Sequence, residues 1–147
     1  MKEQNGTLVG EAMISRKKEL KPYEYYLQMV EEEFFASIDR RDLSATLNCF
    51  CEDAVFTIQS AFTTFEGRDT GIRRMFQNSL ENFSFVVHQH FVHVVDVEHE
   101  RCATQFDVEL LAVGGNKINK SNCNFFYFEN GKFKRVYVFM SGENTLV

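Results

Sequence analysis

The sequence contains no tryptophan, only one proline, and no apolar run close to the roughly 20 residues that a membrane-crossing helix needs. These absences make a membrane-spanning helix and a long proline-rich segment unexpected. The chain instead includes 16 phenylalanines, which are enough for an aromatic core. We expect one domain over residues 22–147 that buries about 70% of its unfolded surface, preceded by a flexible polar tail or an extra helix over residues 1–21.

Clusters of basic residues are also missing. The net charge is −5, the sequence pI is near 5.4, and the Lys and Arg residues are scattered, which disfavours nucleic-acid binding. The four cysteines, Cys49, Cys51, Cys102 and Cys123, match none of the spacings of zinc or redox sites, and no secretory segment follows Met1. We therefore expect buried, reduced thiols in a cytoplasmic protein without a metal, a cofactor or membrane contact.

The strongest local signal is the dipeptide Asn130-Gly131 between two runs of β-branched and aromatic residues, which predicts a long antiparallel hairpin. Two registers are open. A two-residue turn at Asn130-Gly131 would set Asn124 opposite Tyr137, whereas a type I turn with Gly131 as a left-handed bulge would set Asn124 beside Val136.

The bulged register gives the hairpin two largely apolar faces. One face would hold Asn122, Asn124, Phe126, Val136, Val138 and Met140. The other would hold Cys123, Phe125, Tyr127, Phe133, Tyr137 and Phe139. Because both faces need cover, we expect helices on one side and a second copy of the chain on the other, so that Phe125, Tyr127, Phe133, Tyr137 and Phe139 form a homodimer interface.

The remaining patterns alternate between helical and extended spacing. A helix is predicted from Pro22 to Ile38, and a second, capped by Asp42, is predicted to carry Phe50 with Cys49 and Cys51. Further elements are strands at 54–59 and 61–66, a helix from Gly67, and strands at 83–97 and 102–113 before the hairpin. This order predicts an α+β domain with its helices on one face of a mostly antiparallel sheet.

Four short motifs occur in this framework, at residues 38–43 (IDRRDL), 50–56 (FCEDAVF), 65–68 (FEGR) and 128–133 (FENGKF). Together with the element order, they resemble the nuclear transport factor 2-like superfamily, in particular its SnoaL-like group of polyketide cyclases, near the ketosteroid isomerases. The resemblance covers about residues 22–141. It implies a cone in which a curved antiparallel sheet wraps around three N-terminal-half helices and a pocket, with pairing into a homodimer through the convex face, and it favours the bulged register.

The resemblance also identifies three pocket positions. Phe34, Ile58 and Asn124 stand where ketosteroid isomerases have a tyrosine, a carboxylate base and an aspartic acid, so that activity is disfavoured. The Asn124 amide can donate a hydrogen bond to a carbonyl but cannot transfer a proton. It either contacts a ligand or is a buried amide satisfied by neighbouring backbone, and both interpretations stay open.

Histidines are the remaining proton-transfer groups. His88 and His90 alternate onto one face of the long strand, and His90 matches a position where SnoaL-like proteins often place a pocket histidine. We predict His90 as the candidate general base, because an imidazole exchanges protons near neutral pH, although a strand histidine at a subunit contact or half exposed is the simpler interpretation. A metal site with His88 is not expected, since Asp107 and Glu109 should point away from the pocket.

These observations lead to two hypotheses. The first is a protein that binds a small hydrophobic ligand, a candidate isomerase, cyclase or dehydratase that acts by proton transfer. His90 would be its base, and its pocket would be lined by Phe34, Ile58, Phe106, Val108, Val138, Met140 and Asn124. The second is a non-enzymatic dimerisation or protein-interaction module whose pocket is filled by its own phenylalanines. A void below roughly 100 Å³ would favour the second, since ordinary ligand sites measure about 300–1,000 Å³.

Overall fold

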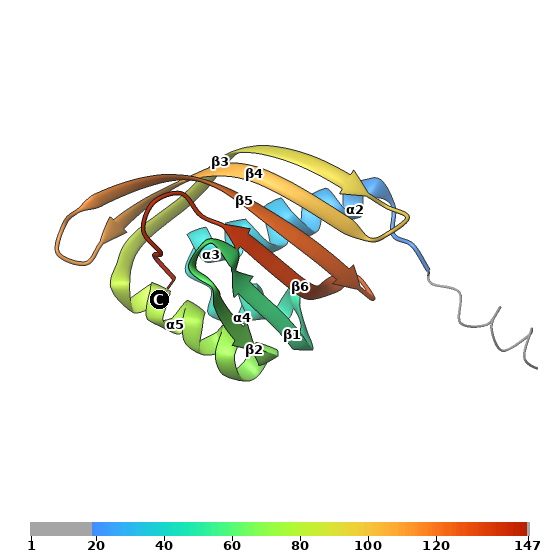
Figure 1. Ribbon diagram of the computed structural model, residues 1–147, viewed down its shortest axis with the longest axis horizontal. Coiled ribbons are helices and arrows are strands. Elements are labelled where there is room, and N and C mark those ends of the chain that lie inside the picture. Colours follow the sequence, from blue (N-terminus) through green and yellow to red (C-terminus); the bar gives the residue numbers. More distant parts are fainter. Residues whose placement is uncertain (1–18, 147) are drawn as a thin grey trace, which may run out of the picture.

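The structure, a computed structural model, describes residues 19–146, so most of the tail or extra helix predicted for residues 1–21 lies outside the described residues. Its elements follow the predicted order of two helical segments, two strands, a helix and four longer strands (Figure 1). They are α2 (Tyr23–Gln28), η1 (Met29–Phe35), α3 (Ala36–Asp39), α4 (Leu43–Asn48), β1 (Phe50–Ile58), η2 (Gln59–Ala61), β2 (Thr63–Glu66), η3 (Gly67–Ile72), α5 (Arg73–Asn82), β3 (Phe83–Asp96), β4 (Arg101–Ala112), β5 (Lys117–Glu129) and β6 (Lys132–Phe139).

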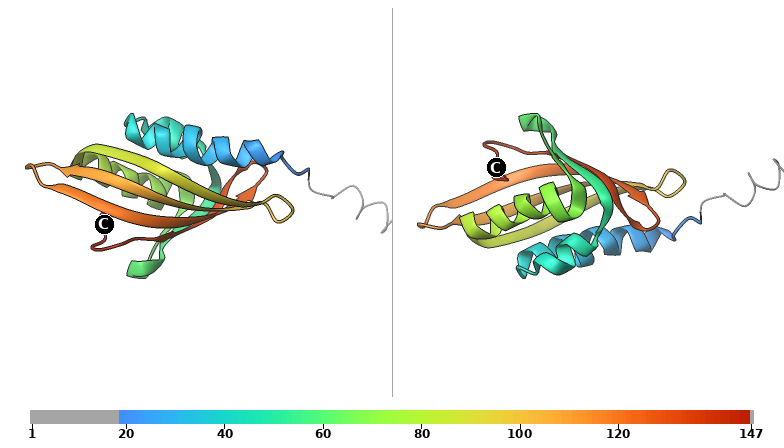
Figure 2. Two further views of the ribbon diagram at one scale, coloured as in Figure 1. Left: turned by 90° about the horizontal axis from the view of Figure 1, so that it is seen from above. Right: turned by 90° about the horizontal axis from the view of Figure 1, so that it is seen from below.

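The sheet has six strands in the order β2-β1-β6-β5-β4-β3. Every neighbouring pair is antiparallel except β1 and β6, which are parallel, so the sheet is mixed. It curves strongly, and α2, η1 and α3 run along one of its faces as a continuous rod (Figure 2). The predicted fold class, an α+β domain with a curved sheet around three helices from the N-terminal half, is confirmed.

The first helical rod buries the side chains predicted from its apolar spacing, including Tyr26, Val30 and Phe34. Its middle part, η1, is a π-helix, in which successive residues are separated by a smaller rotation about the axis than in an α-helix. Phe34 and Phe35 are therefore both buried against the sheet. The Phe34 ring makes edge-to-face contacts with aromatic rings from β1, α5, β5 and β6, which makes it the centre of the core.

The second helix is shorter than predicted. Asp42 caps it as expected, because its Oδ1 accepts a hydrogen bond from the backbone N–H of Ala45 at 3.0 Å. The helix ends before Cys49, whose carbonyl oxygen accepts a hydrogen bond from the N–H of Phe133 in β6. Strand β1 begins at Phe50, so the prediction that Cys49, Phe50 and Cys51 belong to this helix is wrong.

The hairpin between β5 and β6 differs from both predicted registers. Asn130 and Gly131 have φ values of 52° and 77°, so they form a two-residue turn with both residues in the left-handed region. The register then shifts between Tyr127 and Phe128, and beyond this irregularity Asn124 pairs with Val138. Both predicted partners of Asn124 are therefore wrong, because the sequence does not mark the bulge.

The bulge leaves most of the predicted face assignment intact. Because it shifts the pairing by one residue, the side chains of Asn122, Asn124, Phe126, Val136, Val138 and Met140 share the buried face, as predicted. Phe133 lies between the turn and the bulge and belongs to this face as well. It is fully buried, in contact with Phe34 and Phe126, so its predicted place on the dimer-interface face is wrong.

Candidate functional site

A cavity lies between the concave face of the sheet and the helices. It has a volume of about 60 Å³. The structure places these side chains from the predicted set on its wall: Phe34, Phe106, Val108, Asn124, Val138 and Met140. Ile58 is fully buried but does not line the cavity, and Phe56, two residues earlier on β1, contributes to the wall instead.

His90 does not face the cavity. The register of β3 against β4 shifts between Gln89 and Val92, and His90 adopts a positive φ of 59° within this irregularity. The side chain of His90 is 70% exposed, and its Nδ1 lies 2.9 Å from an oxygen of Asp107 on the outer face of the sheet. The predicted position of His90 in the pocket is therefore wrong, because a bulge reverses the expected alternation along the strand.

His88 stands on the cavity wall instead. Its Nδ1 lies 2.6 Å from Oδ1 of Asp39, and its backbone N–H donates to Oδ2 of the same carboxylate at 3.1 Å. A carboxylate can only accept, so Nδ1 carries the proton and Nε2 is free to act as an acceptor. The imidazole also packs between Phe35 and Phe106, with ring centroids at 4.6 and 5.5 Å.

Asp39 was missed as a site residue, although it belongs to the 38–43 motif. It ends α3, and 49 residues separate it from His88. The sequence shows only that Asp39 closely precedes the helix cap Asp42. No local spacing reveals that the helix end meets the long strand opposite His88.

Two asparagines of β5 reach the cavity from the same face of the strand. The Oδ1 of Asn122 accepts a hydrogen bond from the backbone N–H of Ser141 at 3.1 Å. Asn124 is only 3% exposed, and within residues 19–146 its Oδ1 has no hydrogen-bond partner. The neighbouring-backbone partner that one interpretation of Asn124 required is therefore not found in this part of the chain.

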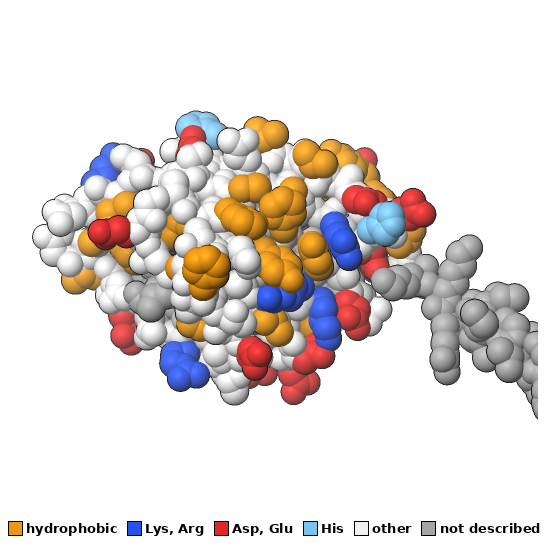
Figure 3. Space-filling view, in the orientation of Figure 1, with side chains coloured by type: hydrophobic (Ala, Val, Ile, Leu, Met, Phe, Trp, Pro, Cys, Tyr) orange, Lys and Arg blue, Asp and Glu red, His pale blue; other side chains and the backbone are white. Residues whose placement is uncertain are grey.

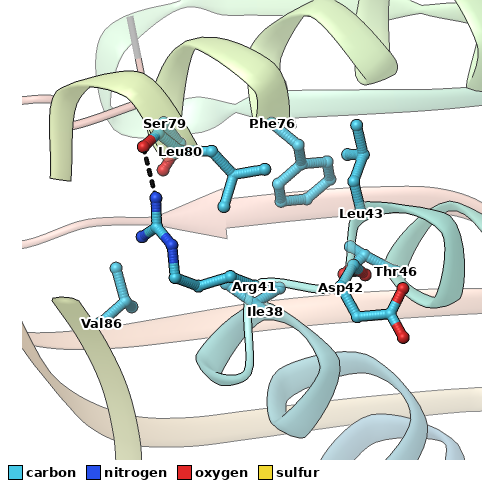
Figure 4. A pocket seen from close by; sticks show the side chains of 9 residues that line it. All are labelled: Ile38, Arg41, Asp42, Leu43, Thr46, Phe76, Ser79, Leu80 and Val86. Atoms are coloured by element: carbon cyan, nitrogen blue, oxygen red, sulfur yellow. Dashed lines mark hydrogen bonds between the residues drawn. The ribbon is translucent and has the colours of Figure 1, made fainter. Parts of the chain in front are cut away.

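A smaller hollow of about 20 Å³ adjoins the cavity and shares Ile38, Phe76, Ser79 and Val86 with it. The side chain of Arg41 reaches along this hollow towards the end of α5 (Figure 4). Its guanidinium donates to the carbonyl oxygens of Leu80 and Phe83 at 2.6 and 2.7 Å. Arg41 thus ties the α3–α4 turn to the junction between α5 and β3.

Other chemistries find little support in the described chain. Burial raises the pKa of the Cys49 thiol to about 12 and also raises that of Cys102, which disfavours a thiolate nucleophile at either position. Within residues 19–146, no group of three His, Cys, Asp or Glu side chains is arranged to hold a metal ion. None of the helices in this part of the chain is long and apolar enough to cross a membrane.

Solved structures with this fold come from several bacteria. A protein assigned as a polyketide cyclase from Pseudomonas putida KT2440 is 18% identical and aligns over 78% of this chain and 90% of its own, with a TM-score of 0.70. One assigned as an isomerase from Bacillus subtilis is 14% identical over 81% and 88%, with a TM-score of 0.73. TerC, co-crystallized with polyporic acid, is 12% identical over 80% and 92%, with a TM-score of 0.68.

The comparison with curated proteins finds no match. The model of the SnoaL-like domain matches residues 32–136, which is more than half of the chain and includes Asp39, His88 and Asn124. The match agrees with the four motifs and with the curved sheet that places these residues together. The chain therefore belongs to the family of SnoaL-like domains.

Proposed function

We propose that this protein binds a small apolar molecule bearing one carbonyl or hydroxyl group and moves a proton on it, as an isomerase, cyclase or dehydratase does. The observation that carries the proposal is the His88–Asp39 pair on the cavity wall, with Nδ1 and Oδ1 2.6 Å apart. The family and the solved structures assigned as a polyketide cyclase and an isomerase support the same class. The apolar rings around the pair suit an apolar substrate.

The proposed proton transfer uses the free nitrogen of His88. Its Nε2 accepts a proton from a carbon next to the substrate carbonyl, and the C–H electron pair moves to the carbonyl oxygen to form an enolate. Asp39 holds the imidazole in one tautomer and stabilises the imidazolium that forms. The proton then returns from Nε2 to another carbon or to a departing hydroxyl, which restores the neutral imidazole.

Asn124 is proposed to hold the substrate oxygen. A buried amide oxygen without a partner costs about 1–3 kcal/mol, and a ligand hydroxyl that donates to it would offset that cost. With the amide rotated by half a turn, its NH₂ group donates instead to a carbonyl or an enolate oxygen. The same side chain thus suits either of the two polar groups that we propose for the ligand.

The volume of the cavity favours a second candidate function. About 60 Å³ is well below the roughly 300–1,000 Å³ of ordinary ligand sites. Phenylalanine rings from the rod, β1, α5 and β4 occupy the interior. A non-enzymatic interaction module with a filled pocket is consistent with this volume, and the first proposal therefore requires that the cavity open.

We also propose that a second copy of the chain covers the convex face. The register places Val94, Ala103, Phe125 and Tyr137 side by side across four strands, and Val94 and Phe125 are 70% and 40% exposed. Hydrophobic side chains gather in the middle of this face, with Lys and Arg beside them (Figure 3). Phe125→Glu should convert a dimer to monomer in sedimentation equilibrium, and a parent chain that is already monomeric would refute the homodimer.

The test of the enzymatic proposal starts with thermal-shift screening against small apolar ketones, phenols and alcohols, because a ligand that binds the folded state raises the melting temperature. For a compound that is turned over, His88→Gln should reduce turnover about a hundredfold or more. His90→Gln is the matched control on the same strand and should leave turnover unchanged. Equal effects of the two substitutions, or no binder in the screen, would favour the interaction module.

A further inference from the structure

The chain after β6 closes the cavity. We call residues Ser141–Leu146 the cover segment. It turns back over the end of the sheet (Figure 1), and Thr145 and Leu146 form part of the cavity wall. Leu146 is half-buried and packs against the hydrophobic core. The volume that a ligand can use therefore depends on where this segment lies.

One end of the cover segment is held by a buried cation. Lys120 is 6% exposed and lies on the same face of β5 as Asn122 and Asn124. Its ammonium donates to the carbonyl oxygen of Ser141 at 2.6 Å and also to that of Glu143. Burial lowers the pKa of Lys120, while the Glu143 carboxylate acts in the opposite direction. The ammonium is thus removed from water and bound to the backbone of the cover segment.

Gly142 shapes the chain around this cation. Its φ of 69° lies in the left-handed region, which turns the carbonyls on either side of it towards Lys120. A Cβ at this position would stand 3.4 Å from the Lys120 ammonium. The N–H of Ser141 also donates to Asn122. Lys120, Asn122 and Gly142 together form a latch between the sheet and the start of the cover segment.

The other end of the cover segment is held more weakly. Thr145 donates from its N–H and its hydroxyl to the sulfur of Met140, a poor acceptor, at 3.4 and 3.5 Å. Leu146 donates to Asn144 within the segment itself. Within residues 19–146, neither Thr145 nor Leu146 shows a hydrogen bond to the helices or to the strands of the sheet. Apolar contact therefore holds this end over the cavity.

We propose that the cover segment is a displaceable lid latched by Lys120, and that the ligand takes the space of Thr145 and Leu146 together with the cavity beneath them. This inference rests on the proposed function. The displaced residues bring a hydroxyl and a branched apolar side chain to the cavity wall, to which Asn124 also belongs. The ligand class that replaces them is a compact apolar molecule with one hydroxyl or carbonyl group.

A binding experiment with 2-naphthol tests the lid. The chain lacks tryptophan, and its five tyrosines absorb at shorter wavelengths than 2-naphthol does, so the fluorescence of 2-naphthol can be excited selectively. A chain that ends at Gly142 should bind 2-naphthol at least tenfold more tightly than the full chain, and Lys120→Met in the full chain should bind several-fold more tightly. Lys117→Met is the matched control, because Lys117 lies on the same strand, is exposed and pairs with Glu109. Its affinity should equal that of the full chain.

A second comparison locates the bound probe. Asn124→Leu in the shortened chain should weaken 2-naphthol binding at least tenfold but leave the binding of naphthalene, which has no hydroxyl, almost unchanged. Equal losses for both probes, or no loss for either, would mean that the probe binds elsewhere and would overturn the inference.

Hydrogen exchange gives a readout that needs no ligand and does not depend on the shortened chain folding. Lys120→Met should speed exchange of the amides in residues 141–146 about tenfold or more. The amides of β4, and those of β5 away from the substituted residue, should exchange as in the parent. If these amides exchange only together with the whole domain in both proteins, the segment is not a lid. Equal 2-naphthol affinity of the full and shortened chains would overturn the lid alone. Absence of binding by both folded chains would overturn the lid together with the proposed function.

Discussion

Each of the two adjoining hollows beneath the sheet has a cation that fixes one of its walls by donating to two backbone carbonyl oxygens. We call these two sets of contacts the Arg41 closure and the Lys120 closure. They differ in the parts of the chain to which the carbonyls belong. At one, Arg41 donates to Leu80 and Phe83, which belong to α5 and to the first position of β3. At the other, Lys120 donates to the carbonyls on either side of Gly142, in a segment outside any helix or strand. The first closure joins elements that are fixed by their own hydrogen bonds, whereas the second joins the sheet to a segment with few.

This difference indicates where the cavity can open. Moving Arg41 aside would expose little, because α5 and β3 remain in place through their own packing. Releasing Lys120 frees a chain that covers the cavity mainly by apolar contact, which costs less free energy to open. The same chemical device thus gives a fixed wall near Arg41 and a movable one near Lys120.

The largest expected effect comes from removing the wall that the two hollows share. Phe76 is buried, lines both hollows and contacts Phe34, Phe50 and Phe56 with ring centroids about 6 Å apart. Phe76→Ala should lower the free energy of unfolding by about 3–5 kcal/mol, measured by urea denaturation. If the Arg41 closure is fixed, hydrogen exchange at the end of α5 should still require global unfolding in this variant. Rapid local exchange there would show that the wall at the Arg41 closure moves as well as the wall at the Lys120 closure.

A smaller loss is expected when the Arg41 closure itself is removed. Arg41→Met deletes two charge-assisted hydrogen bonds made by an exposed residue, one of them partly buried, so the free energy of unfolding in urea should fall by about 1–2 kcal/mol. Arg40→Met is the control, because the adjacent Arg40 is exposed and lies 3.7 Å from Asp42. It should change stability by less than about 0.5 kcal/mol. Faster exchange in residues 141–146 of Arg41→Met would contradict the independence of the two closures.

The fold could be predicted from the sequence because its main signals are local. The Asn130-Gly131 turn, the Asp42 cap and the apolar spacing before Ile38 each identify an element without reference to the rest of the chain. The buried face that includes Asn124 was also predicted, since side chains alternate along a strand whatever its partner.

The candidate site was predicted only in part, because irregularities in the ladders carry no clear signal in the sequence. The bulge in β3 turns His90 outwards and leaves His88 at the cavity. The bulge in the hairpin lies beyond Phe133, so the two-residue turn alone places Phe133 on the core face. The pairing of His88 with Asp39 joins residues from separate elements and depends on how the rod crosses the sheet. Such contacts follow from tertiary packing and cannot be derived from local spacing.

The smallest expected effect concerns the charge on Lys120. Burial lowers the pKa of this group below its usual value of 10.5, so above its folded-state pKa the unfolded chain binds more protons at this position than the folded chain does. The stability of the parent relative to Lys120→Met should therefore rise as the pH increases towards 10.5, since the cost of burying the charge disappears. Urea denaturation of both proteins between pH 7 and 10 measures this difference, while Lys117→Met should follow the parent. If the stability of the parent relative to Lys120→Met stays constant or falls as the pH rises, the carbonyls of the latch stabilise the ammonium as well as water does. The Lys120 closure would then be as hard to open as the Arg41 closure.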